Sequence, residues 1–307
     1  MQPLAGVLVA DLTRYLPGAY ASRELRRLGA RVIRIEPPQG DPMRATAPGW
    51  HDALNGGAES VVCDLKTEPE LARALCARAA VVLESFRPGV AARLGVGPDD
   101  VPARVVYCSL TGFGEGDRRA GHDLNYLGWA GALWDTAPGL PPVQAADLAA
   151  GAQQAVIEIL AALLSGGGAR IVVSMTHGSH ALVAGRPAGL LTGAFACYRI
   201  YETSDGRHVT VAALEPKFFA RLCELLGRTE LAERQYGDEQ EALAAELAAA
   251  FRERPLAAWL ELFDGEDVCV GPVATPAEAE SSLGSGAPGE AAAIGQHTAQ
   301  WRRQLGL

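Results

Sequence analysis

The sequence predicts an α/β protein with a mostly parallel sheet, followed by a smaller α+β domain. Short apolar runs typical of buried strands alternate with helical patterns through the first part of the chain. From residue 186 the pattern changes, because residues 186–193 carry Gly and Pro without periodicity and indicate a linker. Beyond it, Asp205-Gly206 stands between two β-rich runs and predicts a hairpin.

Periodicity and turn residues place the individual elements. In the first part, strands are predicted at residues 6–12, 31–35, 61–65, 80–83, 105–109 and 171–174. Helices are predicted at residues 17–28, 68–79 and 147–164, the first ended by Gly29 and the last by a serine and three glycines. In the second part we expect strands at 196–202, 208–213 and 268–273, and helices at 216–226, 239–252 and 255–263. Residues 281–290 are rich in Gly, Ser and Pro and are expected to be mobile, before a short helix at 298–305.

Composition narrows the classes of function. The net charge is −9 and there are two lysines, Lys66 and Lys217, so we expect neither a nucleic-acid face nor a basic membrane-binding patch. An anionic ligand must be held by a few local arginines. We see no export signal at the N-terminus and expect a cytoplasmic protein, and the apolar stretch at 155–164 is too short to span a bilayer. The six cysteines are scattered singly, which favours buried free thiols over disulfides or a metal site.

Several phrases of the chain, in this order, resemble the family III CoA-transferases, the family that includes α-methylacyl-CoA racemase. They are residues 10–14 (ADLTR), 28–38 (LGARVIRIEPP), 86–90 (FRPGV), 109–114 (SLTGFG), 201–207 (YETSDGR), 214–219 (LEPKFF) and 267–273 (DVCVGPV). The resemblance implies a Rossmann-like large domain, residues 1–185 completed by 280–307, and a linker with a small domain, residues 186–279. It also implies an interlocked homodimer with the active site between the large domain of one subunit and the small domain of the other.

Residues 121–127 (GHDLNYL) resemble the racemase branch of this family, in which His precedes Asp. The resemblance assigns proton transfer to His122, a residue type suited to it near neutral pH. Asp147, at the start of the predicted helix 147–164, reads as an N-cap. By resemblance it also matches the aspartate that is the nucleophile of the transferases and the second acid/base of the racemase. Glu215 matches the glutamate that orients the catalytic histidine, although its residue type alone also fits a solvated strand-end carboxylate.

The remaining site residues concern coenzyme A. Arg34 and Arg87 match family positions that contact the nucleotide part, and arginine suits both bidentate phosphate binding and stacking on adenine. Asn55, and more weakly Arg44 and Lys66, are further candidates for the nucleotide. Asp123 and Tyr126 flank His122 and are expected to line the thioester and pantetheine end.

Two glycine-rich segments need separate interpretation. Residues 112–116 (GFGEG) lack the strand, the spacing and the Lys-Ser/Thr of a phosphate-binding P-loop, and are expected to form a flexible active-site loop. Residues 56–59 (GGAE) stand where relatives carry a basic residue, and the linker after His177 is short for the family. Both departures bear on nucleotide affinity and on the threading of the dimer.

The residues therefore favour an enzyme that racemises 2-methylacyl-CoA thioesters by 1,1-proton transfer through an enolate. It would need no cofactor and no metal, since coenzyme A arrives as part of the substrate. The alternative is CoA transfer between carboxylic acids, with Asp147 forming a mixed anhydride and then an aspartyl-CoA thioester. A further alternative is a family member that binds acyl-CoA without turnover.

Overall fold

The computed structural model describes residues 2–284 and 289–307, which fold into two compact units. Of these described residues, 2–134, 138–184 and 289–307 form the first unit, and 135–137 and 185–284 form the second. Each unit has its own hydrophobic core.

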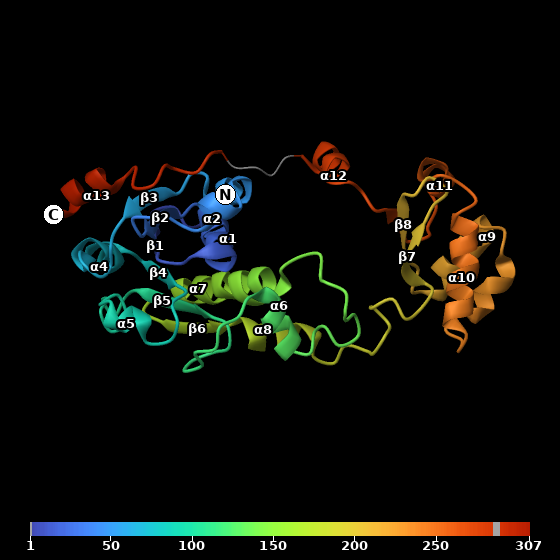
Figure 1. The fold of residues 1–307 in the computed structure, drawn as a ribbon, viewed down its shortest axis with the longest axis horizontal. Coiled ribbons are helices and arrows are strands. Elements are labelled where there is room, and N and C mark those ends of the chain that lie inside the picture. Colours follow the sequence, from blue (N-terminus) through green and yellow to red (C-terminus); the bar gives the residue numbers. More distant parts are fainter. Residues whose placement is uncertain (1, 285–288) are drawn as a thin grey trace. The chain divides into compact units, whose positions relative to one another are not determined.

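Within the described residues, the first unit is built on a six-stranded parallel sheet of order β3-β2-β1-β4-β5-β6 (Figure 1). The strands are β1 (Leu8–Asp11), β2 (Arg31–Glu36), β3 (Glu59–Val62), β4 (Val81–Glu84), β5 (Val106–Thr111) and β6 (Arg170–Ser174). Each predicted strand of this part is present, with some ends displaced, and the α/β prediction is confirmed. The strand order reverses between β1 and β4, which places a binding crevice at their carboxyl ends.

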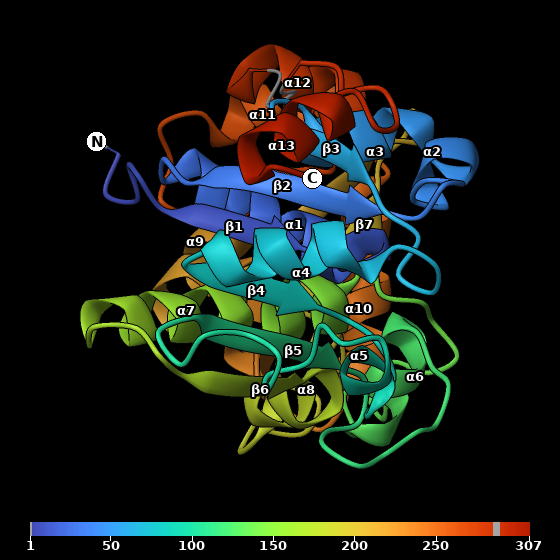
Figure 2. The same cartoon turned by 90° about the vertical axis from the view of Figure 1, so that its left-hand side faces the viewer.

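Helices cover both faces of this sheet. On one face lie α1 (Tyr15–Arg27), the π-helix η1 (Ala146–Gln153) and α7 (Gln154–Leu164); their buried residues include Leu25 and Ile159. On the other face lie α4 (Pro69–Arg78), α5 (Val90–Arg93) and α13 (Thr298–Leu305), as Figure 2 shows for α4 and α13. Trp301 anchors α13, because its ring is buried and its Nε1 donates to Glu59 Oε2 at 2.7 Å. The segment next to the C-terminus is thereby attached to β3.

Among the described residues, four shorter helices lie in the connections of the first unit. These are α2 (Met43–Thr46) and α3 (Pro48–Asn55) between β2 and β3, α6 (Asp123–Trp129) between β5 and η1, and α8 (Met175–Val183) after β6.

The helix formed by η1 and α7 together differs from the sequence expectation. It runs over Ala146–Leu164, 19 residues with a mean hydropathy of 1.4, so by length and composition it could cross a membrane. The expectation that this region is too short was wrong, because it counted the apolar stretch from residue 155, whereas the helix begins at Ala146. A core helix has the same properties, and here Ala152, Ala155 and Ile159 are fully buried beneath the sheet.

The second unit is an antiparallel sheet covered by helices. Within the described residues its sheet has the order β7-β8-β9, with β7 (Tyr198–Glu202), β8 (His208–Ala212) and β9 (Val270–Pro272). Its helices are α9 (Pro216–Leu225), the 3₁₀ helix η2 (Thr229–Arg234), α10 (Gln240–Phe251), α11 (Leu256–Phe263) and α12 (Pro276–Leu283). The predicted hairpin is confirmed, because β7 pairs with β8 on either side of Asp205-Gly206.

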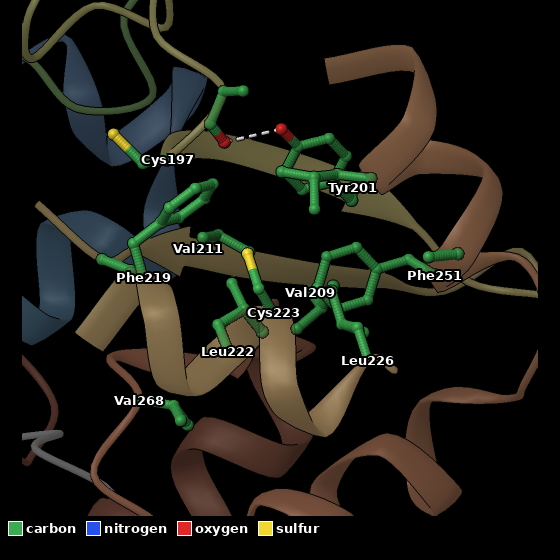
Figure 3. Close-up of a cluster of buried hydrophobic side chains, with 14 of the residues drawn as sticks. Cys197, Tyr201, Val209, Val211, Phe219, Leu222, Cys223, Leu226, Phe251 and Val268 are labelled. Atoms are coloured by element: carbon green, nitrogen blue, oxygen red, sulfur yellow. Dashed lines mark hydrogen bonds between the residues drawn. The ribbon is translucent and has the colours of Figure 1, made fainter. Parts of the chain in front are cut away.

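Aromatic side chains pack among aliphatic ones in the core of the second unit (Figure 3). Phe251 stacks on Tyr201, with ring centroids 5.3 Å apart, and meets Trp259 edge to face. The hydroxyl of Tyr201 donates to the carbonyl of Ala196 at 2.6 Å, so this buried phenol keeps a hydrogen bond.

Two smaller expectations have different outcomes. Residues 281–283 complete α12, so this start of the predicted irregular segment 281–290 is helical, while residues 285–288 lie outside the described residues. All six cysteines are free, as predicted; Cys269 is exposed, and the other five are buried.

Candidate active site

A cavity of about 380 Å³ lies in the first unit, at the carboxyl ends of β1, β4 and β5. Its walls come from the loops that follow these strands and from the first turns of α6 and η1. The side chains that line it include Arg14, Tyr15, Ser85, Arg87, Arg119, His122, Tyr126 and Asp147. It therefore occupies the position at which the reversal of strand order favours a ligand.

Asp147 lies in the first turn of η1, with its side chain partly buried. The predicted N-cap role is wrong by two residues, because the helix begins at Ala146 and Ala145 precedes it. The backbone N–H of Asp147 donates to Asp123 Oδ1 at 2.9 Å, so the carboxylate of Asp123 satisfies a group that the helix leaves without a partner. A wide π-turn of this kind is frequent at functional sites.

The acidity of Asp147 is strongly altered. Burial and, to a smaller extent, the nearby negative charge of Asp123 together raise its pKa to about 7. Burial also raises the pKa of Asp123, whose side chain is 8% exposed. Both the acid and the carboxylate of Asp147 are therefore well populated at neutral pH, which is the condition for a group that must both give and accept a proton.

His122 precedes α6 and lines the same cavity. Its backbone N–H donates to Asn125 Oδ1 at 3.0 Å, which fixes the start of the helix. Its exposed imidazole meets the ring of Tyr15 edge to face, with centroids 6.2 Å apart and planes at 87°. The structure thus brings together His122 and Asp147, which the sequence proposes from two separate motifs.

Tyr126 supports the segment that carries His122. Its buried ring packs edge to face on Phe113, with centroids 5.2 Å apart, and its hydroxyl donates to the carbonyl of Gly121. Burial raises the pKa of this phenol to about 12, so it stays a neutral donor. Tyr126 lines the cavity directly, whereas Asp123 adjoins it through the hydrogen bond that it accepts from the Asp147 N–H.

Three arginines reach the cavity, and they differ in how their charge is used. Arg14 donates to the main-chain carbonyls of Leu12, Thr13 and Ile35. Arg119 pairs with Asp117 at 2.7 Å. Arg87 is exposed, and its side chain makes no hydrogen bond or ion pair with the residues that the structure describes. Arg87 is therefore the cation best placed to hold a phosphate or another anion.

Arg34 occupies a different environment from Arg87. Its guanidinium is 3% exposed and pairs with Asp11 at 2.7 Å and with Asp41 at 2.8 Å. Asn55 is also buried and donates to the carbonyl of His51 at 2.8 Å. Arg34 and Asn55 share a space of about 10 Å³, room for about one water molecule. The structure does not bring either side chain to the cavity that holds His122.

The structure also locates Arg44 and Lys66, the weaker candidates for nucleotide binding, and the glycine loop of residues 112–116. Arg44 pairs with Glu36 at 2.8 Å, and Lys66 is exposed. In the glycine loop, Gly112 lines the cavity of His122, whereas Gly114 and Glu115 border a separate hollow of about 660 Å³ beside α8.

Glu215 belongs to the second unit. It directly precedes α9, as its N-cap, and is exposed. A contact between Glu215 and His122 stays a prediction.

Sequence reasoning missed several residues of the cavity wall, among them Arg14, Tyr15 and Arg119. Arg14 and Tyr15 directly follow the first strand, where a reversal of strand order opens a site. That reversal appears only once the strands are placed in order. A signal for Arg119 was available in the sequence, because it stands three residues before His122.

Comparison with known proteins gives consistent matches. The model of CoA-transferase family III matches residues 4–287. α-Methylacyl-CoA racemase of Homo sapiens is 33% identical over 306 residues, covering 89% of this chain and 78% of the human protein. Succinyl-CoA:glutarate CoA-transferase of Mus musculus is 30% identical over 318 residues, covering 89% of this chain and 72% of the mouse protein. The crystal structure of a CAIB/BAIF family protein from Brucella suis superposes with a TM-score of 0.81 at 28% identity, covering 99% of each chain.

Proposed function

Because the chain belongs to CoA-transferase family III and is an enzyme of the transferase and racemase type, we propose that it racemises 2-methylacyl-CoA thioesters. The observation that carries the proposal is the pair of proton-transfer groups in one cavity, His122 and an Asp147 whose pKa is raised to about 7. Racemisation at the α-carbon needs one group to remove a proton from one face and another to return a proton to the opposite face.

The proton balance follows from these two groups. With one enantiomer, neutral His122 removes the α-proton and the protonated carboxyl of Asp147 returns one to the other face. The products of that turnover are imidazolium and carboxylate, which are the forms required for the reverse reaction. Between the two transfers the substrate is an enolate, and the positive end of the η1 helix dipole would favour its negative oxygen.

Substrate binding would use Arg87, whose side chain has no polar partner in the part of the chain that the structure describes. Arg87 lies at the cavity and would hold a phosphate of coenzyme A, while Asp123 and Tyr126 adjoin the thioester end. Arg34 and Asn55 would contact the nucleotide only if their enclosed space widened, since about 10 Å³ holds no adenine. We propose that the reaction needs no cofactor beyond the coenzyme A of the substrate.

We further propose that the active form is an interlocked homodimer, in which Glu215 of a second copy accepts a hydrogen bond from His122 and orients its ring. Exposed apolar side chains on the first unit support a protein partner. Ile157 is 60% exposed and Leu164 92% exposed on the outer side of α7, and Leu182 is 60% exposed on α8. Light scattering of the purified protein tests the dimer. The cytoplasmic location stays a prediction from the sequence.

CoA transfer is the second candidate, and the same partly buried aspartate favours it. Attack of the Asp147 carboxylate on the thioester carbonyl would release CoA thiolate and leave a mixed anhydride. The thiolate would then attack the aspartyl carbonyl, releasing the first acid and forming an aspartyl-CoA thioester that a second acid consumes. This route assigns no proton transfer to His122.

The test is α-proton exchange followed by NMR, with purified protein and (S)- or (R)-2-methylacyl-CoA in D₂O, without a carboxylate acceptor. We expect deuterium to enter the α-position with loss of configuration, and His122→Ala and Asp147→Ala to abolish this. His208→Ala and Asp99→Ala, which change exposed residues outside the cavity, are the matched controls.

Two results would count against the racemase. If no deuterium enters, but an added carboxylate yields a new thioester that depends on Asp147, the protein is a transferase; hydroxylamine should then trap the aspartyl intermediate. If acyl-CoA binds and neither reaction occurs, the chain is a binding protein.

A further inference from the structure

Tyr15 has an unusual backbone for its residue type. Its φ is +63°, in the left-handed region that bulky residues rarely occupy, and it stands at the first position of α1. Such strain persists only when the surroundings enforce it, and it concentrates at functional sites. Tyr15 lines the cavity that contains His122 and Asp147.

Buried charges hold this strained residue in place. The backbone N–H of Tyr15 donates to Asp41 Oδ2 at 3.2 Å, and the same carboxylate oxygen accepts from Arg34 Nη2 at 2.8 Å. Asp41 and Arg34 are almost fully buried, and Arg34 is tied in turn to Asp11 at the end of β1. The turn is also closely packed, because a methyl group on Gly18 would lie 1.9 Å from Thr13 Oγ1. The conformation of Tyr15 is thus fixed from the core of the sheet.

The side chain that this backbone presents reaches His122. The Tyr15 ring is 47% exposed, yet it meets the imidazole edge to face at 6.2 Å instead of turning into solvent. The hydrogen bond from the His122 backbone N–H to Asn125 fixes the start of α6, but it does not by itself set the side-chain torsions of the imidazole. The contact with Tyr15 limits rotation about those torsions from the cavity side.

We propose that Tyr15 is a positioning residue, whose ring holds the imidazole of His122 in the orientation required for α-proton transfer. The inference rests on the proposed function, in which His122 is one of the two proton-transfer groups. The buried ion pairs of Arg34 with Asp11 and Asp41 then do more than stabilise the fold. They also fix the backbone from which the Tyr15 ring projects.

Two substitutions separate the ring from the hydroxyl. Tyr15→Ala removes the aromatic contact, and Tyr15→Phe keeps it; the exposure of Tyr15 makes both compatible with folding. Leu124→Ala changes an exposed side chain two residues after His122 that does not line the cavity, and serves as the matched control. Each variant is examined by ¹H–¹³C NMR of the histidine rings, assigned with His122→Ala, and by kcat and KM for α-proton exchange.

Tyr15→Ala should move the ring resonance of His122 and leave those of the other five histidines in place. It should lower kcat about three- to tenfold, the range that one pair of aromatic rings is typically worth, with little change in KM. Tyr15→Phe and Leu124→Ala should match the unchanged protein in both measurements.

Three results would overturn the inference. They are an unmoved His122 resonance in Tyr15→Ala, an increase in KM without a fall in kcat, or a Tyr15→Phe variant that behaves like Tyr15→Ala. Failure of the proposed function is seen separately, as full exchange by His122→Ala. In that event the resonance still decides whether Tyr15 holds the ring.

Discussion

Replacing Asp147 by asparagine should abolish activity and, above neutral pH, stabilise the fold. Burial and the charge of Asp123 raise the pKa of Asp147 from 3.8 to about 7, so the folded state holds a proton that the unfolded state releases near pH 4. Between these two values the native state binds more protons, and stability therefore falls as pH rises. At about 1.4 kcal/mol for each pKa unit, ionising Asp147 costs the fold up to about 4 kcal/mol above pH 8.

Asparagine keeps the shape of the side chain and cannot ionise, so Asp147→Asn should recover most of this free energy. The gain should be small at pH 4.5 and reach roughly 2 to 4 kcal/mol at pH 8.5, measured as the change in the free energy of unfolding in urea. Asp117→Asn is the matched control, because the pKa of Asp117 is lowered by its hydrogen bonds with Arg119, and removing its charge should give no such gain.

A gain for Asp147→Asn that is equal at both pH values, or absent at pH 8.5, would refute the reasoning. Either result would show that the surroundings do not disfavour the Asp147 carboxylate. Asp147 would then not be protonated at neutral pH and could not act there as an acid.

Three further substitutions test separate parts of the site. Asp123→Asn should lower the pKa of Asp147, because it removes the neighbouring negative charge while keeping an oxygen for the Asp147 N–H. With the enantiomer for which Asp147 is the carboxylate base, the acidic limb of the pH profile of kcat/KM should move to lower pH, and an unmoved limb would contradict the coupling. Arg87→Ala should raise KM for acyl-CoA about 10- to 100-fold with kcat nearly unchanged, because a charge-assisted hydrogen bond to the nucleotide part is lost. KM for an acyl-pantetheine, which lacks the nucleotide, should be unaffected. Arg34→Ala should destabilise the protein by about 3 to 5 kcal/mol, because it leaves two buried carboxylates without their partner; a change in Tm of less than a few degrees would show that these carboxylates find another partner.

The parallel sheet was predictable because its strands carry local signals. Buried parallel strands are continuous apolar runs, and helices with stop signals separate them, so element types follow from the sequence with errors mainly at the ends. The hairpin of the second unit was predictable for the same reason, since Asp205-Gly206 specifies its turn. The start of η1 was misplaced, because no Ser, Thr, Asp or Asn stands at its N-cap, which is Ala145.

The candidate site was predictable in part. His122 and Asp147 stand in motifs that resemble those of a family, so both could be named as candidates from their residue types and their order in the sequence. The sequence does not show the partners of Arg34, and its contact with the nucleotide stays a prediction. The parallel register of β1 and β2 sets Asp11 beside Arg34, and a loop brings Asp41 to its other side.

By itself, then, the sequence determined the alternation of strands and helices, the hairpin, and the two motifs that carry His122 and Asp147. The tertiary structure alone decided that both side chains share one cavity, that the pKa of Asp147 rises to about 7, and that Tyr15 is held at a positive φ against His122. The physical reason is the range of the interactions. Periodicity and turn chemistry act between neighbours in the chain, whereas desolvation, charge pairing and backbone strain depend on groups that meet only after folding.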